Sequence, residues 1–345
     1  MYTNIKNAWA MFIMHMMVEI ICFTLLGTLK HIGLIEAALI SMLFDIVAFC
    51  PQFIFGIIHE KYKKLDLGTI GVVLMLLSII IANPNKDSII NTFAIILVAL
   101  GNAILHECGA IQTTLLSKAK LFPSALFVAG GSFGVVIGQT LGNLGISKWW
   151  LLVPIIICVL TIITTNKDWL NNDEYPVFNI VVSKVPVITI IIVAFAVTFT
   201  RSYIGYAIPI SWKKEIWQSF LLFFTMGIGK AFGGFVADKI GAYKTALITT
   251  LGSIPFLIAG ENLMIVSIIG IFLFSMTMSI TFGMLLSIMG KNPGLAFGIT
   301  TVALACGVLP VFFIKLSTMT NIIVIIFASL MCAFLLSKTL RKEKL

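Results

Sequence analysis

Several ionisable side chains lie inside long apolar stretches of this sequence. In chain order they are His15, Glu19, Asp45, His106, Glu107, Arg201 and Lys230. A charge within a membrane-spanning helix costs at least about 2.5 to 3.5 kcal/mol on insertion scales, so such residues indicate a functional site. The chemistry they can supply is proton uptake and release by acids and histidines, and binding of an anionic group by a cation.

The acids and histidines are the first candidates. His15 and Glu19 are four residues apart, which places them on one face of a helix near the centre of the membrane. We expect them to share a cavity with His106 and Asp45 for substrate binding or proton coupling. Glu107 is a further candidate, although its side chain points about 100° away from that of His106. A structural hydrogen bond is the simpler alternative for each of them.

The cations have different expected roles. Arg201 is expected to bind an anionic group of the substrate or to pair with an acid in the cavity. Lys230 lies toward the cytoplasmic end of its apolar run, so we expect its ammonium group to extend to the membrane surface and to play a structural part.

The elements that must position these residues are membrane-spanning helices. Hydrophobic residues make up 59% of the chain and charged residues 11%, with a mean hydropathy of +1.09, against about 25% charged residues in soluble domains. The first apolar run carries no cleavage site and is expected to stay as a helix. The predicted fold is all-α and integral to the membrane, with twelve helices over 9–29, 34–58, 68–83, 90–114, 122–145, 149–165, 185–209, 216–236, 243–260, 262–289, 293–314 and 319–337.

The basic residues indicate how these helices are oriented. In this arrangement 15 Lys and Arg residues fall on one side of the membrane and 6 on the other. Cytoplasmic loops carry the excess, so both termini and the central linker are expected in the cytoplasm, with the chain in the cytoplasmic membrane. Topology therefore explains the net charge of +9, and no nucleic-acid partner is expected. The six cysteines all lie in apolar runs and are expected to be buried and unpaired, with no metal or other cofactor.

A short polar loop occurs twice, 178 residues apart. Its members are Gly56, Glu60 and Lys61 in the first copy and Gly234, Asp238, Lys239 and Gly241 in the second. The repeat predicts two six-helix bundles, 1–165 and 185–345, joined by a cytoplasmic linker, 166–184. Asp238 is expected to face the positive N-terminus of a neighbouring helix and so to close the cytoplasmic side.

A small-residue face is predicted in the fifth helix. It consists of Gly130, Gly131, Gly134 and Gly138. This spacing suits close helix packing in lipid, and we expect the crossing to be one at which the two halves rock.

Two halves of six helices, a cytoplasmic linker and the loop Gly-x-x-x-Asp-Lys-x-Gly together resemble the major facilitator superfamily. His15 and Glu19 in the first helix, the stretch from Gly101 to Glu107 in the fourth and the glycines of the fifth resemble its fosmidomycin-resistance-like branch, although Glu19 replaces an aspartate and a proline of the fourth-helix motif is missing. The resemblance implies alternating access driven by a proton gradient. Efflux by antiport is one expected mode, and symport stays open.

We therefore predict a monomeric secondary transporter that moves a small organic solute, anionic or drug-like, with protons and membrane lipid as its other partners. A transition-metal transporter on the same fold is the first alternative, since His15, Glu19, Asp45, His106 and Cys108 are all possible ligands. A receptor, a lipid flippase or an enzyme at the lipid surface is the second. The short loops offer no nucleophile with a base, which argues against an enzyme.

Overall fold

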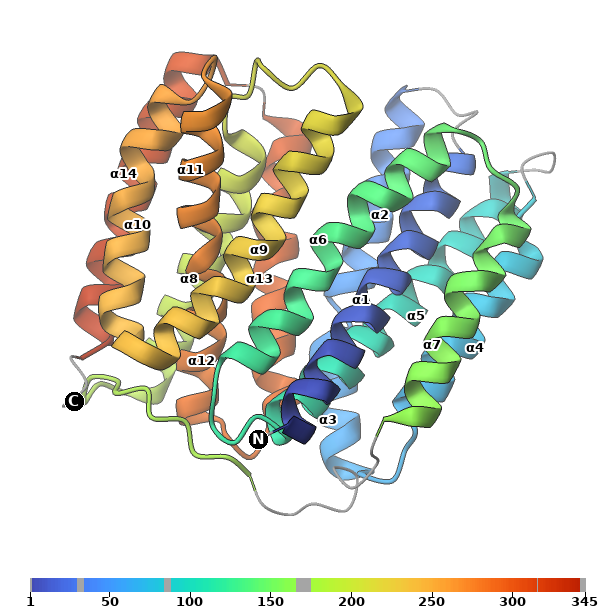
Figure 1. Cartoon of the computed structure of the whole chain (residues 1–345), viewed down its shortest axis with the longest axis horizontal. Coiled ribbons are helices and arrows are strands. Elements are labelled where there is room, and N and C mark those ends of the chain that lie inside the picture. Colours follow the sequence, from blue (N-terminus) through green and yellow to red (C-terminus); the bar gives the residue numbers. More distant parts are fainter. Residues whose placement is uncertain (1, 30–33, 84–87, 166–174, 315, 342–345) are drawn as a thin grey trace.

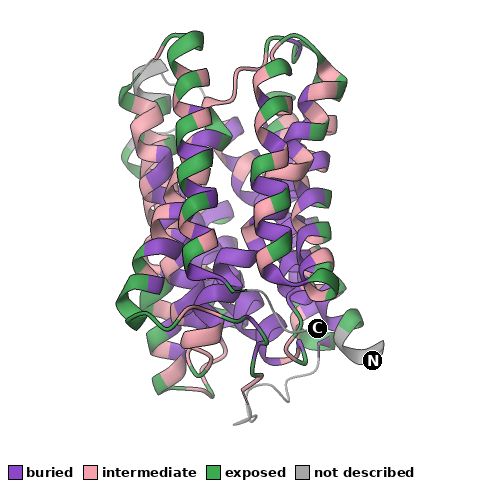
Figure 2. Ribbon diagram, turned by 90° about the vertical axis from the view of Figure 1, so that its left-hand side faces the viewer, coloured by how far each residue is buried: buried purple, intermediate pink, exposed green. Residues whose placement is uncertain are grey.

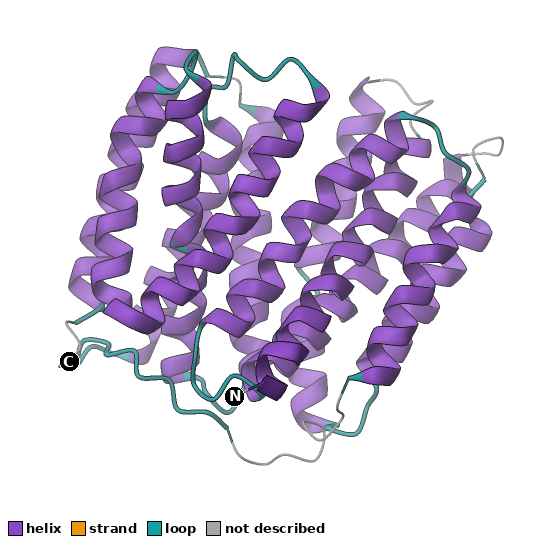
Figure 3. Ribbon diagram, in the orientation of Figure 1, coloured by secondary structure: helices purple, strands orange, loops and turns teal. Residues whose placement is uncertain are grey.

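The described part of the chain is helical (Figure 3), apart from one isolated bridge between Val182 and Leu340. The computed structural model describes residues 2–29, 34–83, 88–165, 175–314 and 316–341. Its helices are α1 (Tyr2–Thr28), α2 (Leu34–Phe49), α3 (Gln52–Lys61), α4 (Leu67–Ile81), α5 (Ser88–Leu115), α6 (Phe122–Asn143), η1 (Lys148–Leu151), α7 (Leu152–Thr164), α8 (Val187–Ala207), α9 (Ile216–Ile240), α10 (Ala242–Ala259), α11 (Met264–Met276), α12 (Met278–Ile288), α13 (Pro293–Phe313) and α14 (Thr318–Thr339).

These helices form twelve apolar spans, and the predicted all-α membrane fold is confirmed. Ten of the spans are at least 18 residues long, and the shorter ones are Leu67–Ile81 and Lys148–Thr164. Large apolar side chains such as Ile57, Ile163 and Phe327 remain exposed around the outside, while buried residues fill the interior (Figure 2). Such an outer surface suits lipid, and the chain is a multi-pass membrane protein.

Two of the spans predicted as continuous helices are broken. The second span divides into α2 and α3 at Cys50 and Pro51, because proline lacks the amide hydrogen that a continuous helix needs. The tenth divides into α11 and α12 at Thr277, beside the point where Gly233 of α9 packs onto the backbone of Met276. The first break lies next to α13 of the opposite half, and the second lies next to α9 of the same half.

The helices from α1 to α7 lie on one side of the molecule and those from α8 to α14 on the other (Figure 1). The exact boundaries of the two bundles remain a prediction, because residues 166–174 of the linker lie outside the described residues. Six lysines of the charge count also lie outside the described residues: Lys30, Lys86, Lys167, Lys315, Lys342 and Lys344. The end of the linker is held by the C-terminal segment, since Ser183 N donates to Thr339 O at 2.7 Å and Arg341 N donates to Val181 O at 2.8 Å.

The glycine face of α6 packs inside the first half. Gly130 and Gly134 lie directly against the backbone of α1, and Gly131 lies against the ring of His15. The prediction that these glycines lie at the crossing where the two halves rock is therefore wrong. The crossing between the halves uses another face of α6, where Gly227 and Gly234 of α9 meet Phe133 and Ala125. The absence of side chains on these α9 glycines lets the two helices approach closely.

Candidate functional site

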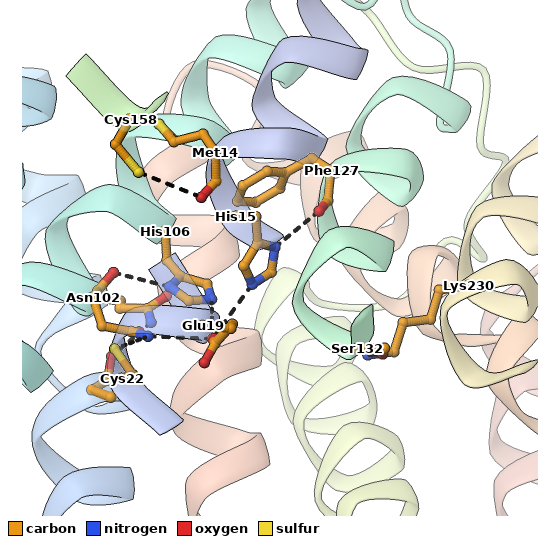
Figure 4. A network of polar contacts seen from close by, with 12 residues as sticks. Met14, His15, Glu19, Cys22, Asn102, His106, Phe127, Ser132, Cys158 and Lys230 are labelled. Carbon is orange, nitrogen blue, oxygen red and sulfur yellow. Dashed lines mark hydrogen bonds and ion pairs between the residues drawn. The ribbon is translucent and has the colours of Figure 1, made fainter. Parts of the chain in front are cut away.

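A buried cluster joins α1 and α5 near the middle of the first half (Figure 4). His106 Nε2 lies 3.2 Å from Glu19 Oε1, and His15 Nε2 lies 3.6 Å from the same oxygen. The two imidazole rings meet edge to face, with their centroids 4.1 Å apart. All three side chains are buried. The structure thus brings together the i, i+4 pair of α1 and the histidine of α5.

Backbone carbonyl groups determine how both histidines are protonated. His15 Nδ1 lies 2.9 Å from Phe127 O, and His106 Nδ1 lies 2.9 Å from Asn102 O. A carbonyl oxygen only accepts hydrogen bonds, so each Nδ1 must carry a hydrogen. In a neutral ring the lone pair is then on Nε2, and both Nε2 atoms face Glu19.

The cluster therefore requires a positive charge or a shared proton. Two neutral rings and an ionised Glu19 would bring three acceptor atoms together, which is repulsive. A proton on either Nε2 or on Oε1 converts this repulsion into a hydrogen bond. Asn102 Nδ2 also donates to Oε1 at 3.2 Å, whereas Glu19 Oε2 is buried and has no hydrogen-bond partner in the described structure. The two nitrogens and the oxygen lie within 4.8 Å of one another, so a small cation could also be held there.

A cavity lies between the two halves, on the far side of α6 from the cluster. In this arrangement it has a volume of about 30 Å³, room for only a water molecule or two, and is lined by residues of α6, α8, α9, α12 and α13. Lys230 is its cation, and Lys230 Nζ donates to Ser132 Oγ at 2.8 Å (Figure 4). Phe282 and Phe297 supply apolar surface, and hydroxyl groups come from Ser124, Thr198, Ser279, Thr281 and Thr300.

Lys230 is the residue whose place the sequence prediction missed. It lies ten residues before the end of α9 at Ile240, which is about 15 Å along the helix axis, or half of the hydrocarbon thickness. This separation was the available signal, because it is too long for the side chain to be assigned to the membrane surface. The lysine instead points into the space between the halves.

Helix α6 connects the cavity with the cluster. Its Phe127 and Gly131 contact His15, while its Ser124, Ala125 and Val128 line the cavity. Ser132, which receives the Lys230 hydrogen bond, is the neighbour of Gly131. The cluster and the wall of the cavity therefore share one helix.

Arg201 and Asp45 lie apart from these contacts. The Arg201 guanidinium packs over the ring of Phe274, 4.6 Å from its centroid, and does not line the cavity. Within the described residues it forms no ion pair with an acid. Asp45 on α2 is half-buried and makes no hydrogen bond or ion pair there, although it is close enough to Glu19 for their charges to interact.

The two copies of the repeated loop make different contacts. Asp238 of α9 accepts hydrogen bonds from Leu121 N at 2.8 Å and Phe122 N at 3.0 Å, at the start of α6. In the first copy, Glu60 instead accepts a hydrogen bond from Tyr175 Oη of the linker at 2.9 Å. Burial, followed by this bond to Glu60, raises the pKa of Tyr175.

The glycines of the two copies are more alike than the acids. Gly56 packs directly on the backbone of Gly294 in α13, just as Gly234 packs on the start of α6. Gly241 ends α9 with φ of 91°, a conformation that residues with a side chain rarely adopt. Lys61 and Lys239 lie over the neighbouring rings of Tyr62 and Phe235.

Comparison with solved structures identifies the fold. The chain matches FucP, a transporter of the major facilitator superfamily in the outward conformation, with a TM-score of 0.68, 15% identity and coverage of 96% of this chain and 97% of FucP. A variant of the Escherichia coli fucose:proton symporter FucP matches with a TM-score of 0.66 and 14% identity over 96% of both chains. The human organic anion transporter MFSD10 matches with a TM-score of 0.66 and 15% identity, over 96% of this chain and 99% of MFSD10. No family model and no curated protein matches the sequence.

The chain therefore has the fold of major facilitator transporters. The resemblance to the fosmidomycin-resistance-like branch stays a prediction.

Proposed function

We propose that this protein is a secondary active transporter that moves a small organic anion across the cytoplasmic membrane by alternating access. The observation that carries the proposal is the cavity between the halves, in which the Lys230 ammonium group lies among hydroxyl groups and aromatic rings. Thr198 Oγ1 and Ser279 Oγ are buried without a hydrogen-bond partner in the described structure and are available to a ligand. A carboxylate on a compact apolar body matches the chemistry of this lining, and the two halves must separate to admit it.

Protons are the proposed coupling ion. The cluster of His15, Glu19 and His106 needs at least one proton to be stable as assembled, and α6 carries its state to the cavity. Glu19 is also close enough to Lys230 for their charges to interact. A substrate anion at Lys230 therefore favours protonation of the cluster, and protonation in turn favours binding of the anion, because coupling between two sites is reciprocal. Because binding of the anion and of the proton favour each other, we infer symport of the anion with protons.

The contacts across the halves support alternating access. They include Asp238 with the start of α6, Gly56 with Gly294, and Thr301 Oγ1 donating to Phe49 O at 3.2 Å. The first two lie near the side to which the basic residues assign the cytoplasm. We infer a cytoplasmic closure that must open for the substrate to leave.

Uptake of radiolabelled anions into proteoliposomes tests the function. A panel of short monocarboxylates, dicarboxylates and hydroxy acids is offered with and without an inward proton gradient. We expect uptake of at least one anion to rise with the gradient and to be lost in Lys230→Met, while Arg201→Lys retains uptake. Wild-type uptake that does not depend on the proton gradient would refute proton coupling. Full activity of Lys230→Met would refute the assignment of the cavity as the binding site.

Titration calorimetry with Zn²⁺ and Mn²⁺ checks what occupies the cluster. The proton proposal expects weak or no binding. Tight binding that is lost in His15→Ala would instead assign the site to a transition metal and would replace the proton as the coupling ion.

A further inference from the structure

Glu107 lies where three helices meet at the closure between the halves. It belongs to α5 and has no exposed surface. Its Oε1 occupies the space beside Gly294 of α13 that a β-carbon would fill, and Gly294 in turn lies on Gly56 of α3. Helices α3 and α5 belong to the first half and α13 to the second, so this carboxyl group is covered only when the halves are together.

The carboxyl group has no partner in this position. Neither oxygen of Glu107 has a hydrogen-bond partner in the described structure. An ionised carboxylate would lose its water there and receive nothing in exchange, which is strongly unfavourable. The N-terminus of α13 is close, but a helix dipole offsets only a small part of such a loss. In the closed arrangement Glu107 is therefore neutral and carries a proton.

Opening of the cytoplasmic side would change this. Separation of α13 from α3 and α5 exposes the carboxyl group to water, and a hydrated glutamate is ionised at neutral pH. Closing then takes up a proton and opening releases it to the cytoplasm.

We propose that Glu107 is a proton-carrying latch, separate from the cluster at Glu19, that must be protonated for the cytoplasmic side to close. The proposal rests on the alternating access inferred above, but not on the identity of the substrate. It also gives the sign of the pH effect: closure is favoured at low pH and weakens as pH rises. A single proton changes the ratio of closed to open molecules by up to tenfold for each pH unit.

Few other titratable groups face this point. The segment Pro293–Phe313 of α13 contains no acid, lysine, arginine or histidine. Helix α3 contributes His59, which is buried three residues after Gly56, and Glu60, which is bound to Tyr175. On α5 itself, His106 points to Glu19. His59 is thus the residue that the experiment must separate from Glu107.

The test measures the closed and open populations directly. Spin labels are attached at Lys64→Cys and Lys291→Cys, two exposed positions on opposite halves, after the partly exposed Cys50 and Cys306 are replaced by alanine. Distance distributions are recorded in lipid nanodiscs, without substrate, between about pH 5.5 and about pH 8.5, where a hydrated glutamate is ionised. Glu107→Gln is compared with the matched control His59→Gln.

We expect the closed population of the labelled parent to fall as pH rises, with a slope of up to tenfold per pH unit. Glu107→Gln should remain closed with little slope, and His59→Gln should keep the parental slope. If Glu107→Gln does not fold, Glu107→Met, which has a similar volume and no charge, is expected to behave in the same way.

A parental slope in Glu107→Gln or Glu107→Met, or loss of the slope in His59→Gln alone, would overturn the latch. Because this readout uses no substrate, it stands or fails independently of the anion uptake assay.

Discussion

Replacing Asp238 by alanine should open the cytoplasmic end of the protein. The Asp238 carboxylate accepts two backbone hydrogen bonds, at 2.8 and 3.0 Å, from Leu121 and Phe122 at the start of α6. Hydrogen bonds to a charged group contribute about 1.5 to 3 kcal/mol each. The favourable position at a helix N-terminus adds about 0.3 to 1 kcal/mol.

The net effect is smaller than this sum, because Asp238 is half-buried and its partners regain water when the halves separate. We take about 2 to 3 kcal/mol for the loss, near the value of one such bond. At 1.4 kcal/mol for each factor of ten, this corresponds to a shift of roughly 30- to 150-fold toward the open form.

Spin labels at Lys64→Cys and Lys244→Cys, both exposed and on opposite halves, report the population that is open to the cytoplasm. The matched control is Glu60→Ala in the other copy of the loop. Its side chain binds Tyr175 of the linker and no helix of the second half, so we expect little opening. An Asp238→Ala protein that stays as closed as the parent, or a Glu60→Ala protein that opens as far, would refute the assignment of Asp238 as the closing contact.

Four further outcomes follow from the described contacts. Glu19→Gln should lose stimulation of anion uptake by a proton gradient while it keeps anion exchange, which is measured as counterflow; gradient stimulation in this variant would contradict the cluster as the coupling site. Lys230→Met should weaken anion binding by roughly 10- to 100-fold in a thermal-shift titration, the range for loss of one charge-assisted bond, whereas Lys230→Arg should retain part of it. Gly134→Val, whose side chain meets the backbone of α1, should lower the melting temperature in detergent by several degrees, since overpacking costs typically about 1 to 3 kcal/mol. The phenol of Tyr175 should ionise above the usual range of about pH 10, and because its raised pKa favours the folded form, that stabilisation should fade as pH rises through this alkaline window; a tyrosine absorbance titration against Tyr175→Phe measures this.

Some of this protein follows from the sequence alone. Backbone groups cannot be left unsatisfied in lipid, so each long apolar run had to become a helix, and the twelve spans could be placed to within a few residues. The spacing of His15 and Glu19 likewise fixed their common face, because helix geometry leaves no other arrangement. The break at Pro51 was a possible prediction, since proline removes one helix hydrogen bond, although Pro255 and Pro310 lie inside helices that continue through them.

Other features depended on how the helices are rotated about their axes. Lipid is as apolar as the side chains of a helix interior, so hydropathy gives the length of a span and says little about which face meets which neighbour. Sequence could not show that His106 joins Glu19 while the adjacent Glu107 turns to α13, or that Lys230 rather than Arg201 reaches the cavity.

The dependence on helix packing also explains why the two copies of the repeated loop make different contacts. Its second copy predicted a contact between Asp238 and a helix N-terminus, which the tertiary structure has, whereas Glu60 of the first copy is hydrogen-bonded to Tyr175 of the linker. The sequence by itself determined which segments enter the membrane. The packing of one half against the other decided which of them meet, because only a specific crossing of helices brings two faces within hydrogen-bond distance.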